Sequence, residues 1–230
     1  MSTNRFSFLC FLFISNILTA QNKINIGVEG GLSKVMLYGN GVVKEYKHFA
    51  PGYTAGLSFQ YNFTSILSIR SGLALERKGT AAKNFAITDQ DGNMYAKADI
   101  RLRSDYLIVP ILVRATTGKK VNLFVNAGPY VGCLLRTAYT YSYGIYNYPS
   151  TGTIKFDNSP YTKKYDWGAS VGLGIAVPIK KLLLSLELRN NIGLYNISAV
   201  HEANADGKSS KTYSGNLLIG LAYKFEKTTD

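Results

Sequence analysis

The chain is 230 residues long, with 46% hydrophobic and only 17% charged residues, a composition that excludes an intrinsically disordered protein. Its 26 lysines and arginines and its 14 acids give a formal net charge of +12. The aromatic content of 13% and the 22 glycines favour β-structure, in one or two domains.

The first 20 residues predict a secretory signal peptide. Arg5 precedes a mostly apolar run over 6–18, and the small residue Ala20 is followed by a polar stretch. The apolar run is too short to span a bilayer, which needs roughly 20 residues. We therefore expect cleavage after Ala20, export of the mature chain to the outer membrane, and a single β-barrel domain over 21–230.

Strict alternation of apolar and polar residues predicts strands along the rest of the chain. In 53–63 the odd positions are all apolar or aromatic and the even positions are small or polar, and 67–76 repeats the pattern after a short turn. These two segments form a predicted hairpin. Eight alternating segments occur in all: 24–29, 53–63, 67–76, 107–114, 121–128, 166–175, 184–189 and 217–225.

The connections between these segments alternate in length. Short turns are expected at 62–65, 116–120 and 178–181, and long loops at 39–51, 79–103, 136–164 and 198–212. This layout is typical of an all-β, eight-stranded antiparallel up-and-down transmembrane β-barrel with short periplasmic turns and long extracellular loops. The structural rival is a soluble lipocalin-like barrel, but a soluble fold gives no reason to sort its loops by length.

The charged residues of the predicted strands lie on the face opposite the leucine, isoleucine and valine side chains. An Arg or Lys on the lipid side at mid-membrane would cost about 2–4 kcal/mol, and several would exceed a domain's whole stability of about 5–15 kcal/mol. The charged face must therefore turn inward. We predict an interior polar network made of Glu29, Arg70, Glu76, Arg114, Glu187, Arg189 and Lys224.

Aromatic residues lie near the ends of the predicted strands. Such positions match the girdles that membrane barrels carry at both interfaces, although Tyr and Phe are also common in any sheet. The girdle interpretation is the favoured one. Its members are Tyr53, Phe63, Tyr106, Tyr165, Trp167, Tyr213, Tyr223 and Phe225.

Four segments carry a resemblance to a known family. They read YLIVPILV at 106–113, GPYVG at 128–132, DWGASVGLG at 166–174 and GLAYKF at 220–225. With them the chain resembles the PorT-like outer-membrane β-barrel proteins of Bacteroidota, a porin family. The resemblance implies an outer-membrane barrel, tied to protein secretion in some members, whose aromatic-ended last strand is read by the barrel-assembly machinery. Relatives often carry an acid where this chain has Ile108.

One catalytic motif is matched literally. The segment GASVG at 168–172 fits the G-x-S-x-G pattern of serine hydrolases, which needs a strand-to-helix turn and His and acid partners. Ser170 lies inside a predicted strand, and His48 and His201 lie in loops at the far end. We therefore expect these glycines to provide space inside a narrow barrel, with no enzymatic role.

Ligand-binding motifs are equally weak. The segment DQDGN at 89–93 suggests a calcium loop, but its glycine comes too early for an EF-hand, and it is better explained as a turn. Two histidines and a single mature cysteine, Cys133, argue against a transition-metal site. We expect no metal and no cofactor, and Cys133 is expected to face outward as a small hydrophobic residue.

The third long loop has a basic excess and many tyrosines. Arg136, Lys155, Lys163 and Lys164 can contact lipopolysaccharide phosphates, although solvated loop charge explains them equally well. Tyr139, Tyr141, Tyr143, Tyr146 and Tyr148 favour a binding surface or a strand extension above the membrane.

These features predict a non-enzymatic, monomeric outer-membrane barrel with a structural or loop-mediated binding role at the cell surface. Its expected partners are outer-membrane lipid and lipopolysaccharide, the barrel-assembly machinery, and a further surface or secretion protein. The basic residues do not gather on one element, which argues against nucleic acid. The alternatives are a narrow pore or a component of a protein-secretion apparatus, and, least favoured, an enzyme acting on lipid.

Overall fold

A computed structural model describes residues 24–39, 48–88, 94–145, 148–156, 162–199 and 209–225, with side chains at all of these except 84–88, 94–96, 143–145 and 148–156. The predicted signal peptide, the DQDGN segment, His201 and the last five residues lie outside the described residues, as do the side chains of Lys155, Tyr143 and Tyr148. Tyr146 also lies outside them. Among the described residues, no helix is long and apolar enough to cross a membrane.

The described residues form nine strands. They are β1 (Ile24–Tyr38), β2 (Ala50–Asn62), β3 (Leu67–Thr88), β4 (Met94–Thr117), β5 (Asn122–Ile145), β6 (Tyr148–Phe156), β7 (Tyr165–Ile179), β8 (Leu182–Gly193) and β9 (Lys211–Phe225).

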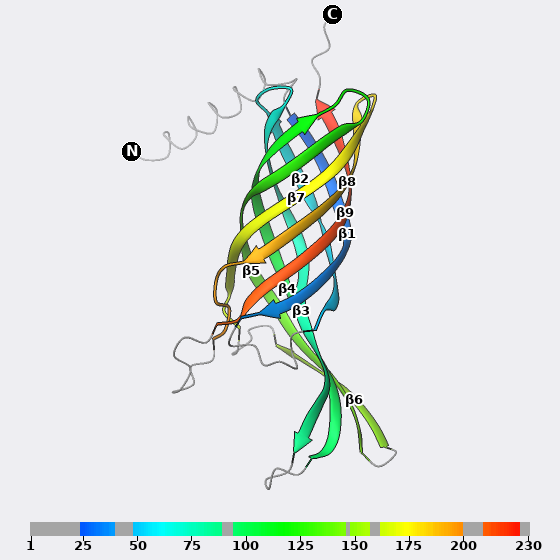
Figure 1. Ribbon diagram of the computed structural model, residues 1–230, viewed down its shortest axis with the longest axis vertical. Coiled ribbons are helices and arrows are strands. Elements are labelled where there is room, and N and C mark those ends of the chain that lie inside the picture. Colours follow the sequence, from blue (N-terminus) through cyan, green and yellow to red (C-terminus); the bar gives the residue numbers. More distant parts are fainter. Residues whose placement is uncertain are drawn as a thin grey trace, which may run out of the picture.

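Eight of these strands close into a ring of antiparallel neighbours. Each strand pairs with the next one along the chain, except that β5 pairs with β7, and β9 returns to pair with β1 along its whole length. The closing register runs from Ile24 opposite Phe225 to Tyr38 opposite Lys211. Within the barrel each of the eight strands has a neighbour on both sides, which confirms the predicted eight-stranded up-and-down barrel (Figure 1).

The ninth strand, β6, lies outside the ring. It pairs with the far half of β5, from Thr137 opposite Phe156 to Ile145 opposite Tyr148. At the same end, β3 and β4 remain paired well beyond the barrel. Figure 1 shows β3, β4, β5 and β6 projecting together from one end of the barrel, and we call this sheet the extension.

Two of the connections predicted as long loops are therefore mostly strand. Within 79–103 the chain is extended up to Thr88 and again from Met94, and within 136–164 it is extended up to Ile145 and again over 148–156. These residues were predicted as loops because they lack apolar alternation. They form strands because they pair with each other outside the barrel, where the outward face need not be apolar. The three short turns lie at the opposite end, which we call the turn end (Figure 1).

The alternation sorts side chains to the two sides of the barrel wall. Outward positions carry exposed apolar residues such as Leu57, Val113, Val125 and Leu188, whereas inward positions are buried. Tyr106 corrects the predicted aromatic girdle, because it is 0% exposed. It neighbours outward-facing Leu107 on β4 and therefore points into the barrel. The other seven predicted girdle residues lie on the outer surface at strand ends.

Candidate functional site in the barrel interior

A chain of alternating charges crosses the interior near the turn end. Arg70 pairs with Glu29 at 2.5 Å, and Arg189 reaches the same carboxylate at 2.8 Å. Arg189 also pairs with Glu187 at 2.6 Å, and Glu187 pairs with Arg114 at 3.2 Å. All five side chains are buried. We call this set, Glu29, Arg70, Arg114, Glu187 and Arg189, the arginine cluster.

Neutral side chains complete the arginine cluster on its turn-end side. The Nε of Arg114 donates to Asn126 at 2.7 Å, and its Nη1 donates to Gln60 at 3.1 Å. The Phe124 ring stacks on the guanidinium, 3.7 Å from centroid to Cζ. This ring needs Gly174, because a Cβ there would lie 2.5 Å from Phe124 Cζ and 2.3 Å from a backbone oxygen. The glycines of β7 thus make room for interior side chains.

A second polar cluster lies nearer the extension. Lys78 Nζ donates to Asp166 at 2.8 Å, to the Tyr130 hydroxyl at 3.0 Å and to Thr212 at 3.2 Å. The Thr212 hydroxyl donates to the same Asp166 oxygen at 2.7 Å. Lys78 and Asp166 are each 1% exposed, so their charges are compensated within the protein. We call Lys78, Tyr130, Asp166 and Thr212 the lysine cluster.

Apolar packing supports the lysine cluster. Tyr106, Ile108, Tyr130 and Leu134 form a buried group. Ile108 is therefore part of an apolar layer. A Cβ at Gly132 would lie 2.6 Å from the Ile108 side chain, so this glycine makes room for the layer.

Glu76 lies in the interior without an arginine partner. It accepts hydrogen bonds from Asn191 at 2.8 Å and from Ser214. Ser33 and Thr54 both contact Asn216 in the same region, at 2.5 and 3.1 Å. Hydrogen-bonded polar side chains therefore fill the space between the charges.

The structure places six of the seven predicted interior residues as buried side chains: Glu29, Arg70, Glu76, Arg114, Glu187 and Arg189. Five of these form the arginine cluster. Lys224 is half-buried and lies outside it, at the turn-end mouth. Lys78 and Asp166 were missed by the sequence reasoning. Lys78 continues the inward alternation of Glu76 just beyond the predicted segment 67–76, so a longer strand would have revealed it. Asp166 already lies on the polar face of the predicted segment 166–175 and was left out of the interior set.

Among the described residues, two cavities of the interior are separate from each other. One, of about 90 Å³, lies near the extension and is lined by Lys78, Tyr106 and Thr212 among others. The other, of about 520 Å³, lies at the turn end and includes Arg114 and Lys224 in its lining. The two linings share no residue, and buried polar side chains fill the space between them.

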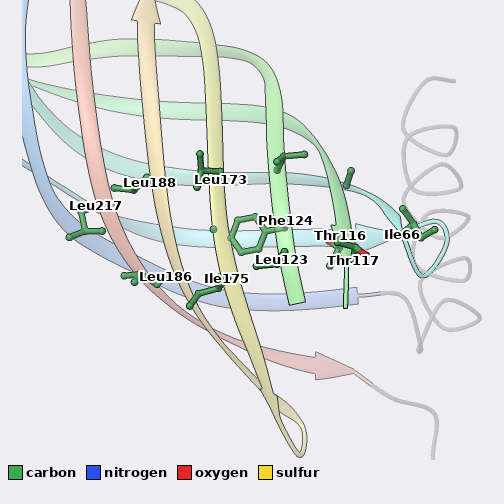
Figure 2. A pocket seen from close by; sticks show the side chains of 13 residues that line it. Ile66, Thr116, Thr117, Leu123, Phe124, Leu173, Ile175, Leu186, Leu188 and Leu217 are labelled. Atoms are coloured by element: carbon green, nitrogen blue, oxygen red, sulfur yellow. The ribbon is translucent and has the colours of Figure 1, made fainter. Parts of the chain in front are cut away.

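A third hollow lies on the outer surface. Its volume is about 590 Å³, and no charged side chain lines it. Figure 2 shows that its lining comes from the turn between β2 and β3, from the end of β4 and from β5, β7, β8 and β9, with leucines at outward positions. Its labelled apolar members are Ile66, Leu123, Phe124, Leu173, Ile175, Leu186, Leu188 and Leu217.

The outer surface changes from apolar to charged along β4. Outward positions carry Leu107 and its apolar successors towards the turn end, and Asp105 and charged residues towards the extension. Asp105 pairs with Arg77 on β3 at 2.7 Å and with Arg136 on β5 at 2.7 Å. Arg77 also stacks on Tyr53, 4.7 Å from the ring centroid. The outward apolar residues between this point and the turn end form a surface that we call the apolar belt. Asp105, Arg77 and Arg136 mark its border towards the extension, which we call the rim.

The serine-hydrolase motif has no catalytic surroundings in the described residues. Ser170 is fully buried in β7, and its hydroxyl has no protein hydrogen-bond partner. The strand continues to Ile179, so the motif lacks the strand-to-helix turn that it needs. His48 is exposed and pairs with Ala81 beside the extension. In the described part of the chain, no three His, Cys, Asp or Glu side chains are grouped as metal ligands.

A family model described as "Outer membrane protein beta-barrel domain" matches residues 19–199 of the chain. No curated protein matches the chain closely enough to count as a relative. The match to the family model covers most of the barrel, from before β1 to the end of β8.

Several solved structures are similar in fold. The outer membrane protein OprG from Pseudomonas aeruginosa is 15% identical, with 89% of this chain and 97% of that chain covered at a TM-score of 0.46. A major outer membrane protein from Thermus thermophilus is 13% identical, covering 87% and 98% at 0.47. Ail, the attachment invasion locus protein of Yersinia pestis, is 10% identical, covering 87% and 98% at 0.38. Likenesses at this level carry no argument about function.

Proposed function

The chain belongs to the outer membrane protein β-barrel domain family, and from this we propose that it is a sealed, non-enzymatic barrel whose extension binds ligands at the cell surface. The family places the protein in the outer membrane. Short turns of such barrels face the periplasm, so the turn end is the periplasmic end and the extension projects outside the cell.

The observation that carries the proposal is the filled interior. Eight strands enclose a space just wide enough for side chains. Here it contains four buried cations and four buried anions, held in the arginine and lysine clusters and at Glu76. A pore would need a continuous polar path, whereas these groups bond to one another. With the interior filled, ligands are expected to bind to the extension and to the outer surface next to it.

Phosphate groups of lipopolysaccharide are the partner that fits the rim. Arg77 and Arg136 share one carboxylate, Asp105, so the three residues carry one positive charge in excess. The Arg136 side chain is 56% exposed and can turn to a phosphate by charge-assisted hydrogen bonding. Above it on the same face of β4, Arg101 and Arg103 together with Asp99 add one further positive charge in sum. Below the rim, outward apolar residues of β4 and β5, such as Leu107 and Val131, offer a surface to acyl chains.

Binding of purified lipopolysaccharide to the detergent-solubilised protein tests this proposal. Arg136→Gln should weaken binding by about five- to tenfold, in line with about 1 kcal/mol for a charge-assisted hydrogen bond at a partly exposed site. Lys119→Gln is the matched control, because this exposed lysine lies in a periplasmic turn. Equal affinity for dephosphorylated lipopolysaccharide, or equal binding by both variants, would contradict the proposal.

The resemblance to PorT-like barrels supports two finer assignments. We place the protein with that group, and we assign its last strand to recognition by the barrel-assembly machinery. Strand β9 ends on exposed Tyr223 and Phe225, which stack edge to face at 5.0 Å. Removal of both aromatic rings should lower the amount of barrel recovered in outer membranes while leaving refolding of the purified chain unchanged.

A further inference from the structure

The periplasmic end of the barrel contains a cavity of about 520 Å³ whose lining is partly polar and partly apolar. It is bordered by the turn between β2 and β3 and by the ends of β4, β5 and β9. Arg114 and Lys224 line it, together with amide and hydroxyl side chains, and no described Asp or Glu does. Its polar members include Asn25, Gln60, Asn62 and Ser68.

The arginine cluster at the floor of this cavity carries one positive charge in excess. The arginine cluster contains three guanidinium groups and two carboxylates, and Arg114 is the member that reaches the cavity. The nearest further acid on β3 is Glu76, eight residues along the strand from Ser68, which is roughly 26 Å at 3.3 Å per residue. A buried charge in excess favours an anion at the one side open to solvent.

Hydrogen-bond donors converge on the same floor. A guanidinium has five N–H donors, and Arg114 uses three, towards Asn126, Gln60 and Glu187. Ser68 lies directly opposite Arg114 in the β3–β4 register. The Ser68 hydroxyl is buried, lines the cavity and has no protein hydrogen-bond partner. Arg114 therefore has two N–H groups beyond these three bonds, and the Ser68 hydroxyl comes from the register position opposite it.

We propose that the periplasmic cavity binds a phosphate group, held by Arg114 and Ser68 at the floor and by Lys224 at the turn-end mouth. Planar guanidinium groups and hydroxyls suit the oxygen atoms of phosphate, and Lys224 adds a second positive charge. The group enters from the periplasm as free phosphate or as the headgroup of a phospholipid. This site is independent of the lipopolysaccharide surface at the other end of the barrel.

Titration of the intact, detergent-solubilised protein with inorganic phosphate and with glycerol phosphate tests the site, using ³¹P NMR line broadening at constant ionic strength set by chloride. Saturable binding of either probe is expected. Lys224→Gln and Ser68→Ala should each weaken it by about three- to tenfold, and Lys119→Gln should not change it. Tighter binding of glycerol phosphate supports a lipid headgroup as the source, and equal or weaker binding supports free phosphate.

The variant Arg114→Gln should abolish binding, but its buried position makes folding a concern. Heat-dependent gel migration checks that each variant still forms the barrel, and the Lys224 and Ser68 variants decide the question if Arg114→Gln does not fold. The proposal is overturned if the phosphate signal broadens no more than in the presence of a control barrel, or if both Lys224→Gln and Ser68→Ala bind as the unmodified protein does.

Discussion

At the residue scale, the barrel depends on charges that compensate one another in a space without bulk water. Arg189 is the centre of the arginine cluster, because it contacts both Glu29 and Glu187. Burial of each charge alone would be costly, and only the pairing makes it tolerable. The interior is therefore sensitive to the loss of a single partner.

Arg189→Met leaves two buried carboxylates with reduced compensation. We expect the free energy of unfolding to fall by about 3–5 kcal/mol, the usual cost of breaking a buried pair. Urea unfolding in lipid vesicles measures this through Trp167, the single tryptophan. Lys181→Gln, at an exposed turn, should change stability by less than about 0.5 kcal/mol. A stable Arg189→Met variant would show that the cluster does not hold the barrel together.

Gly174 tests the close packing around Arg114. Gly174→Ala forces its Cβ against Phe124 and a backbone oxygen of β8, so we expect a loss of about 1–3 kcal/mol. Gly30→Ala is the matched control, because the nearest atom to its Cβ would be 3.5 Å away. The same unfolding assay compares them, and similar stabilities of the two variants would argue against the stacked arrangement.

The sequence predicted part of this interior. Period-two alternation indicates that Glu29, Glu187 and Arg189 share one side of the sheet, but it cannot say which charges meet. Glu29 lies on β1 and Arg189 on β8, 160 residues later in the chain. They contact each other because β9 pairs with both of these strands and closes the ring between them. Asp105 shows a second limit: it faces outward, and its partners are set by its register neighbours, Arg77 and Arg136.

At the element scale, strands extend further than their apolar alternation. The outward positions of β4 change from charged residues to Leu107, Val109, Ile111 and Val113 at the rim of the belt. The rule that outward residues are apolar therefore predicts the barrel portion of β4 and misses its extension. Pairing with β3 and β5 continues across this change.

The extension should be dispensable for the barrel. Replacing residues 80–102 and 138–162 with short turns removes its pairs, but all ring pairs closer to the turn end remain. We expect the shortened protein to keep heat-dependent gel migration. We also expect its lipopolysaccharide binding to weaken only in part, because Arg101 is removed whereas Arg77 and Arg136 at the rim are kept. Loss of the folded band would mean that the extension is part of the barrel's core.

The apolar belt should tolerate charge only at its rim. Leu173→Arg, in the middle of β7, should lower stability by about 2–4 kcal/mol, whereas Tyr165→Arg, at the start of the strand, should cost about 0–1 kcal/mol. Unfolding from lipid vesicles measures both. Equal costs at the two positions would contradict the assignment of this face to lipid.

At the scale of the whole molecule, the closed ring of strands also explains why the interior is filled with charged side chains. The eight strands pair all the way round, so each charged side chain must point either into the confined interior or out past the apolar belt. The four cations and four anions inside then form a plug, with a separate cavity at each end.

Single-channel recording of the purified protein in planar lipid bilayers tests the sealed interior most directly. We predict insertion without stable unitary conductance, for the full chain and for the protein with a shortened extension. Reproducible, ohmic conductance steps from the full chain would contradict the account, because ions would then pass where the arginine and lysine clusters lie.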